Sequence, residues 1–196
     1  MCYNLAKFQV AQGVPAENIT IMTTYKGQFF ALRQRCLQEP MLKKVKVVTV
    51  DRYQGEENDI VLLSLVRSNK VGFVKKLNRL CVALSRARIG LYIVGNAKIL
   101  QEQSKDVWGY VLNMLQSRYC PPAIGPTMTV HCPRHPYNKH ECTDPMSVPT
   151  AFCQERCTVV FNGCGHQCPS TCHFSLHAQY VAFDCVVFLV VRTCGS

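Results

Sequence analysis

Metal-ligating side chains are concentrated at one end of this 196-residue chain. All six histidines and ten of the thirteen cysteines follow Tyr119, and the densest stretch lies at residues 153–185. Such a stretch has little apolar material to bury, so it is not expected to fold without a metal ion whose binding supplies folding free energy. Thiolate and imidazole groups at this density indicate zinc, which takes four such ligands in a tetrahedron.

The net charge divides the chain at the same place. Residues 1–119 hold 18 Lys and Arg against 8 Asp and Glu, whereas residues 120–196 hold four of each kind. The whole net charge of +10 therefore lies in the first part, which favours a phosphate-rich partner there. Prolines at the junction suit a linker. We expect a domain over 1–119, a linker over 120–130, a Cys/His-rich region over 131–185 and an apolar tail of unassigned role over 186–196.

Composition excludes several classes of protein. With 48% hydrophobic residues the chain is not disordered, and no apolar run approaches the roughly 20 residues of a membrane-spanning helix. The first residues contain no apolar core of signal-peptide length. We therefore expect reduced thiols in the cytoplasm, with the nucleus as the alternative location, where cysteine clusters bind metal more often than they form disulfides.

The first part alternates between strand-like and helix-like segments. Apolar, β-branched runs predict strands over 19–23, 45–50, 60–65 and 91–94. Helical spacing predicts helices in the intervals, including 28–38 and 77–87. Strands that are apolar throughout indicate an α/β fold with a parallel sheet covered on both faces. Cys2, Cys36 and Cys81 lie in helix-like contexts and are expected to be buried.

Three polar segments contain residues that packing alone does not require. They read T-T-Y-K-G-Q at 23–28, T-V-D-R-Y-Q-G-E-E-N-D at 49–59 and N-R-L-C-V-A-L-S-R-A-R at 78–88. Together, over about residues 15–100, they resemble the second RecA-like domain of superfamily-one helicases of the nonsense-mediated-decay group. The resemblance implies a RecA-like parallel sheet and ATP-dependent action on RNA, with DNA as the alternative.

The resemblance also implies roles for single residues. Arg86 is at the position of an arginine finger, a guanidinium that stabilises negative charge on the transferred phosphoryl group. The residues implied to contact the nucleotide are Gln54, Gly55, Glu57 and Arg86, and those implied to contact nucleic acid are Tyr25, Gln28, Thr49, Arg67 and Ser68. Without the motif, helix 79–88 would be interpreted as a solvated basic face, and Glu56 and Asp59 as solvated or capping residues.

Two motor motifs are missing from the sequence. There is no G-x-x-x-x-G-K-[ST] loop and no strand ending in the Asp-Glu pair that would hold magnesium. In the family these belong to the first RecA-like domain. We therefore expect a fragment or truncated product of a longer helicase, in which Arg86 and Glu57 line half of a nucleotide cleft. ATP and magnesium would bind only with the first domain present, and this polypeptide alone would not hydrolyse ATP.

The segment C-G-H-x-C-x₃-C-H at 164–173 resembles the NF-X-type zinc-finger repeat. Both halves in this order resemble NF-X-type zinc-finger-containing helicase-like proteins. Our first choice for one zinc site is Cys164, His166, Cys168 and Cys172, although the grouping stays open. The further candidates are Cys153, Cys157, His173, His177 and Cys185, and a second set upstream is Cys132, His135, His140 and Cys142. A disulfide-linked or free-thiol loop is the alternative.

Two functions follow from these patterns. The first is the C-terminal part of an ATP-dependent RNA helicase-like protein with attached zinc fingers. The second is a non-catalytic zinc-binding scaffold or regulatory module that holds a protein partner through its fingers. Salt dependence of binding separates them, because only a phosphate-binding surface releases counterions.

Overall fold

The structure, a computed structural model, describes residues 1–65, 77–118, 124–132, 135–149, 153–160, 165–169 and 171–172, and the backbone of 186–191. The helices are α1 (Cys2–Ala11), α2 (Lys26–Gln38), α3 (Leu77–Leu84), α4 (Ala97–Gln103) and α5 (Tyr110–Arg118), with short turns η1 (Ala16–Asn18), η2 (Pro40–Leu42), η3 (Val50–Arg52) and the π-helical η5 (Lys105–Gly109). The strands are β1 (Ile19–Thr23), β2 (Lys46–Thr49), β3 (Asn58–Ser64), β4 (Ala87–Gly95), β5 (Ile124–Gly125), β6 (Met128–His131), β7 (Lys139–Cys142) and β8 (Val186–Val191).

Six strands form one parallel sheet in the order β2-β1-β3-β4-β8-β5, and β6 and β7 form a separate antiparallel hairpin. This arrangement confirms the predicted RecA-like parallel sheet. The chain passes from β1 to β2 on one side and then returns to β3 on the other. The carboxyl ends of β1 and β3 therefore form the switch point at which open α/β sheets bind ligands.

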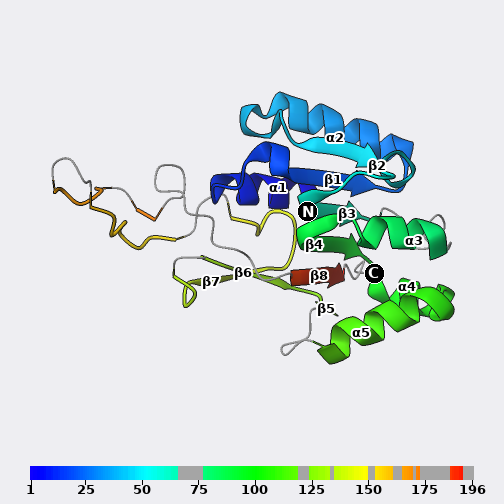
Figure 1. Ribbon diagram of the computed structural model, residues 1–196. Helices are drawn as coiled ribbons and strands as arrows, with labels where there is room; N and C mark the ends of the chain where they lie inside the picture. Colours follow the sequence, from blue (N-terminus) through cyan, green and yellow to red (C-terminus); the bar gives the residue numbers. More distant parts are fainter. Residues whose placement is uncertain are drawn as a thin grey trace.

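Alternate residues of the strands pack against two layers of helices. Ile21 and Leu62 face α1 and α2, whereas Val61 and Leu63 face α3, α4 and α5. Figure 1 shows α1 and α2 on one side of the sheet and α4 and α5 on the other. This alternation follows from the period-two geometry of a strand, and burial on both faces explains why the middle residues of the strands are mostly apolar.

The hairpin β6–β7 belongs to the core beside α1. Met128 and Cys142 are 1% and 0% exposed and lie in the same apolar cluster as Leu5 and Phe8. The Asn4 amide donates to the carbonyl oxygen of Pro145, just after the hairpin. β5 and the first residues of β6 fall within 120–130, the segment predicted as a linker.

Several local expectations need adjustment. The helix predicted over 77–87 ends at Leu84, because the backbone amide of Asn58 pairs with the Arg86 carbonyl (3.0 Å) and draws the chain into β4. Helix α4 was not predicted; Asn96 begins it by accepting a hydrogen bond from the Ile99 amide (3.2 Å). Of the three cysteines expected to be buried, Cys2 and Cys36 are buried as predicted. The prediction for Cys81 is wrong, since α3 buries Leu80 and Ala83 and exposes Cys81.

Candidate nucleotide site and metal centre

The Q-G-E-E segment crosses one face of the sheet, from the carboxyl end of β2 to the amino end of β3. Tyr53, 1% exposed, anchors it, with its hydroxyl 3.1 Å from Oγ1 of Thr20. Gly55 has φ of 79°, in the left-handed region that favours glycine. Gln54, Glu56 and Glu57 are left exposed along the crossing.

Arg86 meets this segment from the turn between α3 and β4. Its Nε donates to the carbonyl oxygen of Val82 (2.9 Å) and its Nη1 to the carbonyl oxygen of Glu56 (3.2 Å). The structure thus brings together the two motifs that lie about thirty residues apart in sequence. Both oxygens that accept from Arg86 are neutral, and among the described residues no carboxylate is paired with its guanidinium.

A cavity of about 610 Å³ opens beside the crossing segment. It is lined by Val50, Asp51, Gln54, Leu77, Asn78, Arg79 and Val82. Arg79 Nε lies 3.2 Å from Asp51 Oδ1. Of the predicted nucleotide residues, only Gln54 lines this cavity; Glu57 and Arg86 are not among the lining residues. Sequence reasoning did not assign Asn78 or Asp51 a site role, although both belong to the quoted motifs.

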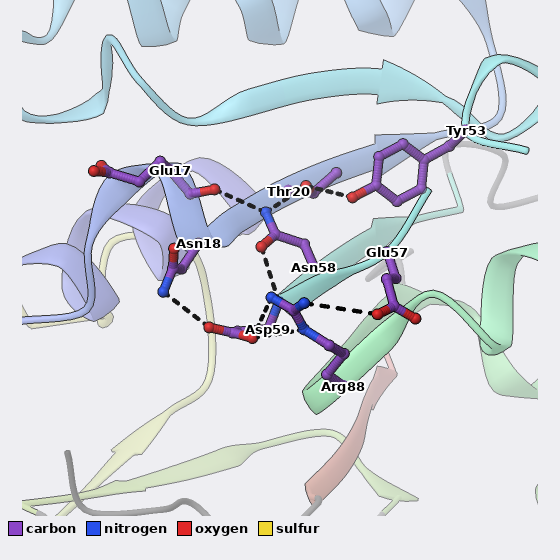
Figure 2. A network of polar contacts seen from close by, with 8 residues as sticks. All are labelled: Glu17, Asn18, Thr20, Tyr53, Glu57, Asn58, Asp59 and Arg88. Atoms are coloured by element: carbon purple, nitrogen blue, oxygen red, sulfur yellow. Dashed lines mark hydrogen bonds and ion pairs between the residues drawn. The ribbon is translucent and has the colours of Figure 1, made fainter. Parts of the chain in front are cut away.

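A polar network at the amino ends of β1, β3 and β4 holds Glu57 (Figure 2). Asp59 Oδ1 accepts from Arg88 Nε and Nη2 (2.8 and 2.7 Å), and Asp59 Oδ2 accepts from the Asn18 amide (2.8 Å). Arg88 Nη1 reaches Glu57 Oε1 at 3.6 Å. Asp59, expected to be solvated or capping, therefore links β3 to Arg88 of β4 and to Asn18 of η1, just before β1.

Asn58 is the buried member of the same network. Its amide nitrogen donates to the Glu17 carbonyl oxygen (2.9 Å) and to Thr20 Oγ1 (3.0 Å), and its side-chain oxygen accepts from the Asp59 amide (2.9 Å). We expect Asn58→Ala to lower the free energy of unfolding by about 1–3 kcal/mol, because it leaves buried polar atoms unsatisfied. Urea unfolding measures this, with Asn113→Ala on the exposed side of α5 as the matched control. Equal effects of the two substitutions would contradict the prediction.

The predicted nucleic-acid residues gather at the opposite edge, where the strands end. Thr23 of β1 is in register with Thr49 of β2 and Ser64 of β3. Gln28 joins two of these strands: Thr23 Oγ1 donates to its side-chain oxygen, and its amide nitrogen donates to Ser64 Oγ (2.8 Å). Tyr25 stands at the start of α2 beside them. Arg67 and Ser68 lie outside the described residues.

Four ligand atoms from three parts of the cysteine-rich region converge on one point. The Sγ atoms of Cys132, Cys153 and Cys172 and a ring nitrogen of His135 all lie within 4.8 Å of one another. His135 Nδ1 is 3.6 Å from Cys132 Sγ and 3.3 Å from Cys153 Sγ, and Cys132 and Cys172 Sγ are 3.5 Å apart. A tetrahedral zinc site with bonds of about 2.0–2.3 Å has ligand atoms about 3.3–3.8 Å apart. These four residues fit a Cys₃His zinc centre.

The thiols of this cluster differ in acidity. Burial opposes ionisation of Cys153, but hydrogen bonds from the Asn138 side chain and the Glu155 backbone lower its pKa to about 7. Burial and the neighbouring Cys132 and Cys153 thiols raise the pKa of Cys172 to about 12. A bound cation favours the thiolate form of every ligand, so metal binding by such a cluster releases protons.

The other predicted ligands are placed elsewhere or lie outside the description. His140 Nε2 donates to the Ser147 carbonyl oxygen (2.7 Å), and Cys142 lies in the apolar core, where burial raises its pKa to about 11. Cys157 and Cys168 are buried and His166 is exposed; none of them belongs to the four-residue cluster. Cys164, His173, His177 and Cys185 lie outside the described residues. Of the first-choice grouping, Cys172 lies in the cluster with Cys132, His135 and Cys153; Cys164 lies outside the described residues, so that grouping stays a prediction.

A family model described as an AAA domain matches residues 1–98, half of the chain. The chain belongs to this AAA domain family. NFX1-type zinc finger-containing protein 1 of Homo sapiens is 39% identical over 93% of the chain. Helicase required for RNAi-mediated heterochromatin assembly 1 of Schizosaccharomyces pombe is 45% identical over 60%, and RNA helicase aquarius of Mus musculus is 48% identical over 45%. The chain spans only 9%, 12% and 6% of the lengths of these proteins.

These similarities confirm the predicted resemblance to helicase-like proteins with NF-X-type zinc fingers. Gln54, Glu57 and Arg86 all lie within the AAA domain match, whereas the cysteine–histidine cluster lies beyond it. Because similarity to the human protein covers 93% of the chain, it extends well past residue 98. None of the helices in the described part of the chain has the length and hydropathy that a membrane crossing demands.

Proposed function

We propose that this chain is the C-terminal motor part of an ATP-dependent RNA helicase, supplying one wall of a nucleotide site that a first RecA-like domain completes. The observation that carries the proposal is the position of Arg86 beside the Q-G-E-E segment, where its partners among the described residues are the neutral carbonyl oxygens of Val82 and Glu56. Its neighbour Arg88 is neutralised by Asp59 and Glu57. An arginine whose charge is not paired in the described structure is suited to meet a phosphate.

In this mechanism the chain contributes charge and position. The Arg86 guanidinium leaves the Glu56 carbonyl and donates to oxygens of the transferred phosphoryl group, where negative charge accumulates. Gln54 and Arg79 offer amide and guanidinium donors in the adjacent cavity. The Asp59–Arg88 bridge holds Glu57 in place. ATP with magnesium would supply the phosphoryl group, and a phosphate loop on the first RecA-like domain would hold it.

We assign nucleic-acid contact to the carboxyl edge of the sheet. Gln28 couples the end of β1 to the end of β3, with Tyr25 and Thr49 beside it. We propose RNA rather than DNA as the nucleic acid, because the relatives at 45% and 48% identity are named for RNAi and RNA. Free thiols at the described cysteines agree with a reducing location, which we propose to be the cytoplasm.

The test is ATP hydrolysis by the purified chain in the presence of RNA. We expect no measurable turnover, because one wall of the site cannot position magnesium and the triphosphate. Robust turnover that disappears in Arg86→Ala would overturn the divided-site proposal.

The second candidate function is a zinc-binding scaffold that holds a protein partner. The Cys132–His135–Cys153–Cys172 cluster favours it, since that cluster lies outside the AAA domain match and in the part of the chain that carries no net charge. A partner bound there would be retained at high salt, unlike RNA bound by the basic part.

A further inference from the structure

We propose that one zinc ion bound by Cys132, His135, Cys153 and Cys172 fastens the cysteine-rich segment to the core of the motor domain, and that this ion stabilises the motor domain itself. The inference does not depend on helicase activity. It concerns a site whose ligands come from both sides of the β7 strand in sequence, rather than from one compact repeat.

The first half of the site is a turn that is closed by its own backbone. Cys132 directly follows β6, its amide donates to the Asn138 carbonyl (3.1 Å), and the Asn138 amide donates to the His135 carbonyl (2.8 Å). The His135 amide donates in turn to the Cys132 carbonyl (3.1 Å). These bonds hold Cys132 and His135 in place without metal, so half of the tetrahedron is preorganised.

This turn is rooted in the motor core. It connects β6 to β7, and Met128, Val130 and Cys142 of that hairpin are buried in the cluster that also contains Leu5 and Phe8 of α1. The position of the turn is therefore coupled to the helical layer that covers one face of the main sheet. The coupling arises from packing, because the hairpin cannot move without exposing these side chains.

The second half of the site has few other constraints. Among the described residues of 153–172, regular pairing is limited to two isolated bridges, Arg156 with Thr171 and Val160 with Gln167. Cys172 is held through its amide, which donates to the Glu155 carbonyl (2.7 Å), and Asn138 reaches across to Cys153 Sγ (3.4 Å). Figure 1 shows this part, in yellow to orange, extending away from the sheet. We infer that metal ligation holds the 153–172 segment against the turn that follows β6.

The ligand pairing separates this site from a self-contained finger. Cys172 Sγ lies 3.5 Å from Cys132, forty residues earlier, and not in a group with Cys168 or His166 of its own repeat. The closure of so long a loop by a metal has a large entropic effect on the unfolded chain. A ligand that binds only the folded form also raises its stability by mass action.

Trp108 provides a reporter that is independent of the metal region. It is the only tryptophan in the sequence, it is fully buried, and it packs on the face of the sheet opposite the hairpin. Its fluorescence therefore follows unfolding of the motor core rather than release of the cysteine-rich segment. We expect removal of zinc from the full chain by a chelator to lower the midpoint of the Trp108 transition by about 5–10 °C.

The ligand set is tested by metal content and by cobalt substitution in the full chain. Cys132→Ser and Cys153→Ser should each lose one equivalent of bound zinc and the absorption of one tetrahedral cobalt–thiolate site. The controls are Cys81→Ser, an exposed thiol on α3, and His166→Ala, an exposed histidine of the repeat; both should keep that equivalent. If the serine variants do not fold, the chelator experiment on the unmodified chain still decides the coupling.

Two results would overturn the proposal. If His166→Ala loses one equivalent of zinc and Cys132→Ser keeps it, the ion belongs to the repeat at 164–173. Loss of zinc from the unmodified chain with an unchanged Trp108 transition would show that the ion holds only its own segment.

Discussion

Arg86→Ala is expected to lower ATP turnover by about 10³–10⁵-fold in a motor that contains both RecA-like domains. The reason is that its guanidinium, paired with carbonyl oxygens of Val82 and Glu56 and with no described carboxylate, is the charge available to the phosphoryl group. The measurement requires this chain in place of the homologous segment of the human relative, with steady-state hydrolysis compared at saturating RNA. RNA affinity without nucleotide should be unchanged.

Two matched variants distinguish a specific role of the Arg86 guanidinium from the effect of losing one positive charge. Arg86→Lys keeps the charge but loses the planar fork, so it should recover little of the activity. Arg33→Ala removes an arginine from the exposed side of α2 and should leave turnover intact. Full activity in Arg86→Ala would exclude Arg86 from the nucleotide site and leave the scaffold function as the better account.

RNA affinity of the chain is expected to fall several hundred-fold between about 50 and 200 mM salt. Each phosphate neutralised on a single strand contributes a slope of about −0.7 to log K against log salt, and about six contacts give this loss. The physical basis is the net charge of +10 in residues 1–119, with none in the rest. Fluorescence anisotropy of a labelled single-stranded RNA measures the slope.

Two lysine variants locate the contact. Lys26→Gln, at the first residue of α2 beyond the carboxyl end of β1, should reduce the slope by about 0.7. Lys44→Gln, just before β2 at the other edge and near Glu17 (3.7 Å), should not change it. Binding that is insensitive to salt would instead favour a protein partner at the cysteine-rich region, which lies in the part of the chain without net charge.

The strands of the motor were predictable because their signal is local. Four of the five residues of Ile19–Thr23 are β-branched, and the structure buries all five as β1. Helix ends were less predictable: the A-L-S-R-A-R motif has helical composition to Ala87, yet pairing with β3 converts its last residues to turn and strand. The apolar run at 186–191 gave no indication of its partner, and it pairs with β4 and β5.

The partners of charged side chains were harder to predict from the sequence than the helices and strands were. Arg86 and Arg88 are two residues apart in a motif that assigns a role only to the first. Their surroundings differ because Arg86 lies in the turn before β4, where it donates to the carbonyl oxygens of Val82 and Glu56, whereas Arg88 lies in β4 and pairs with Asp59 of the neighbouring β3 and with Glu57. That difference identifies which of the two charges is available to a ligand.

By itself the sequence determined the α/β class, the order of the motifs, the confinement of charge to one part and the presence of metal ligands in the other. Those properties depend on composition and on short-range periodicity, which the chain carries before it folds. Only the tertiary structure decided that Cys172 meets Cys132 and His135 rather than His166 or Cys168, the described ligand candidates of its own repeat. Ligand atoms share an ion when their distances suit a tetrahedron, and across forty residues that distance depends on how the intervening hairpin packs against α1.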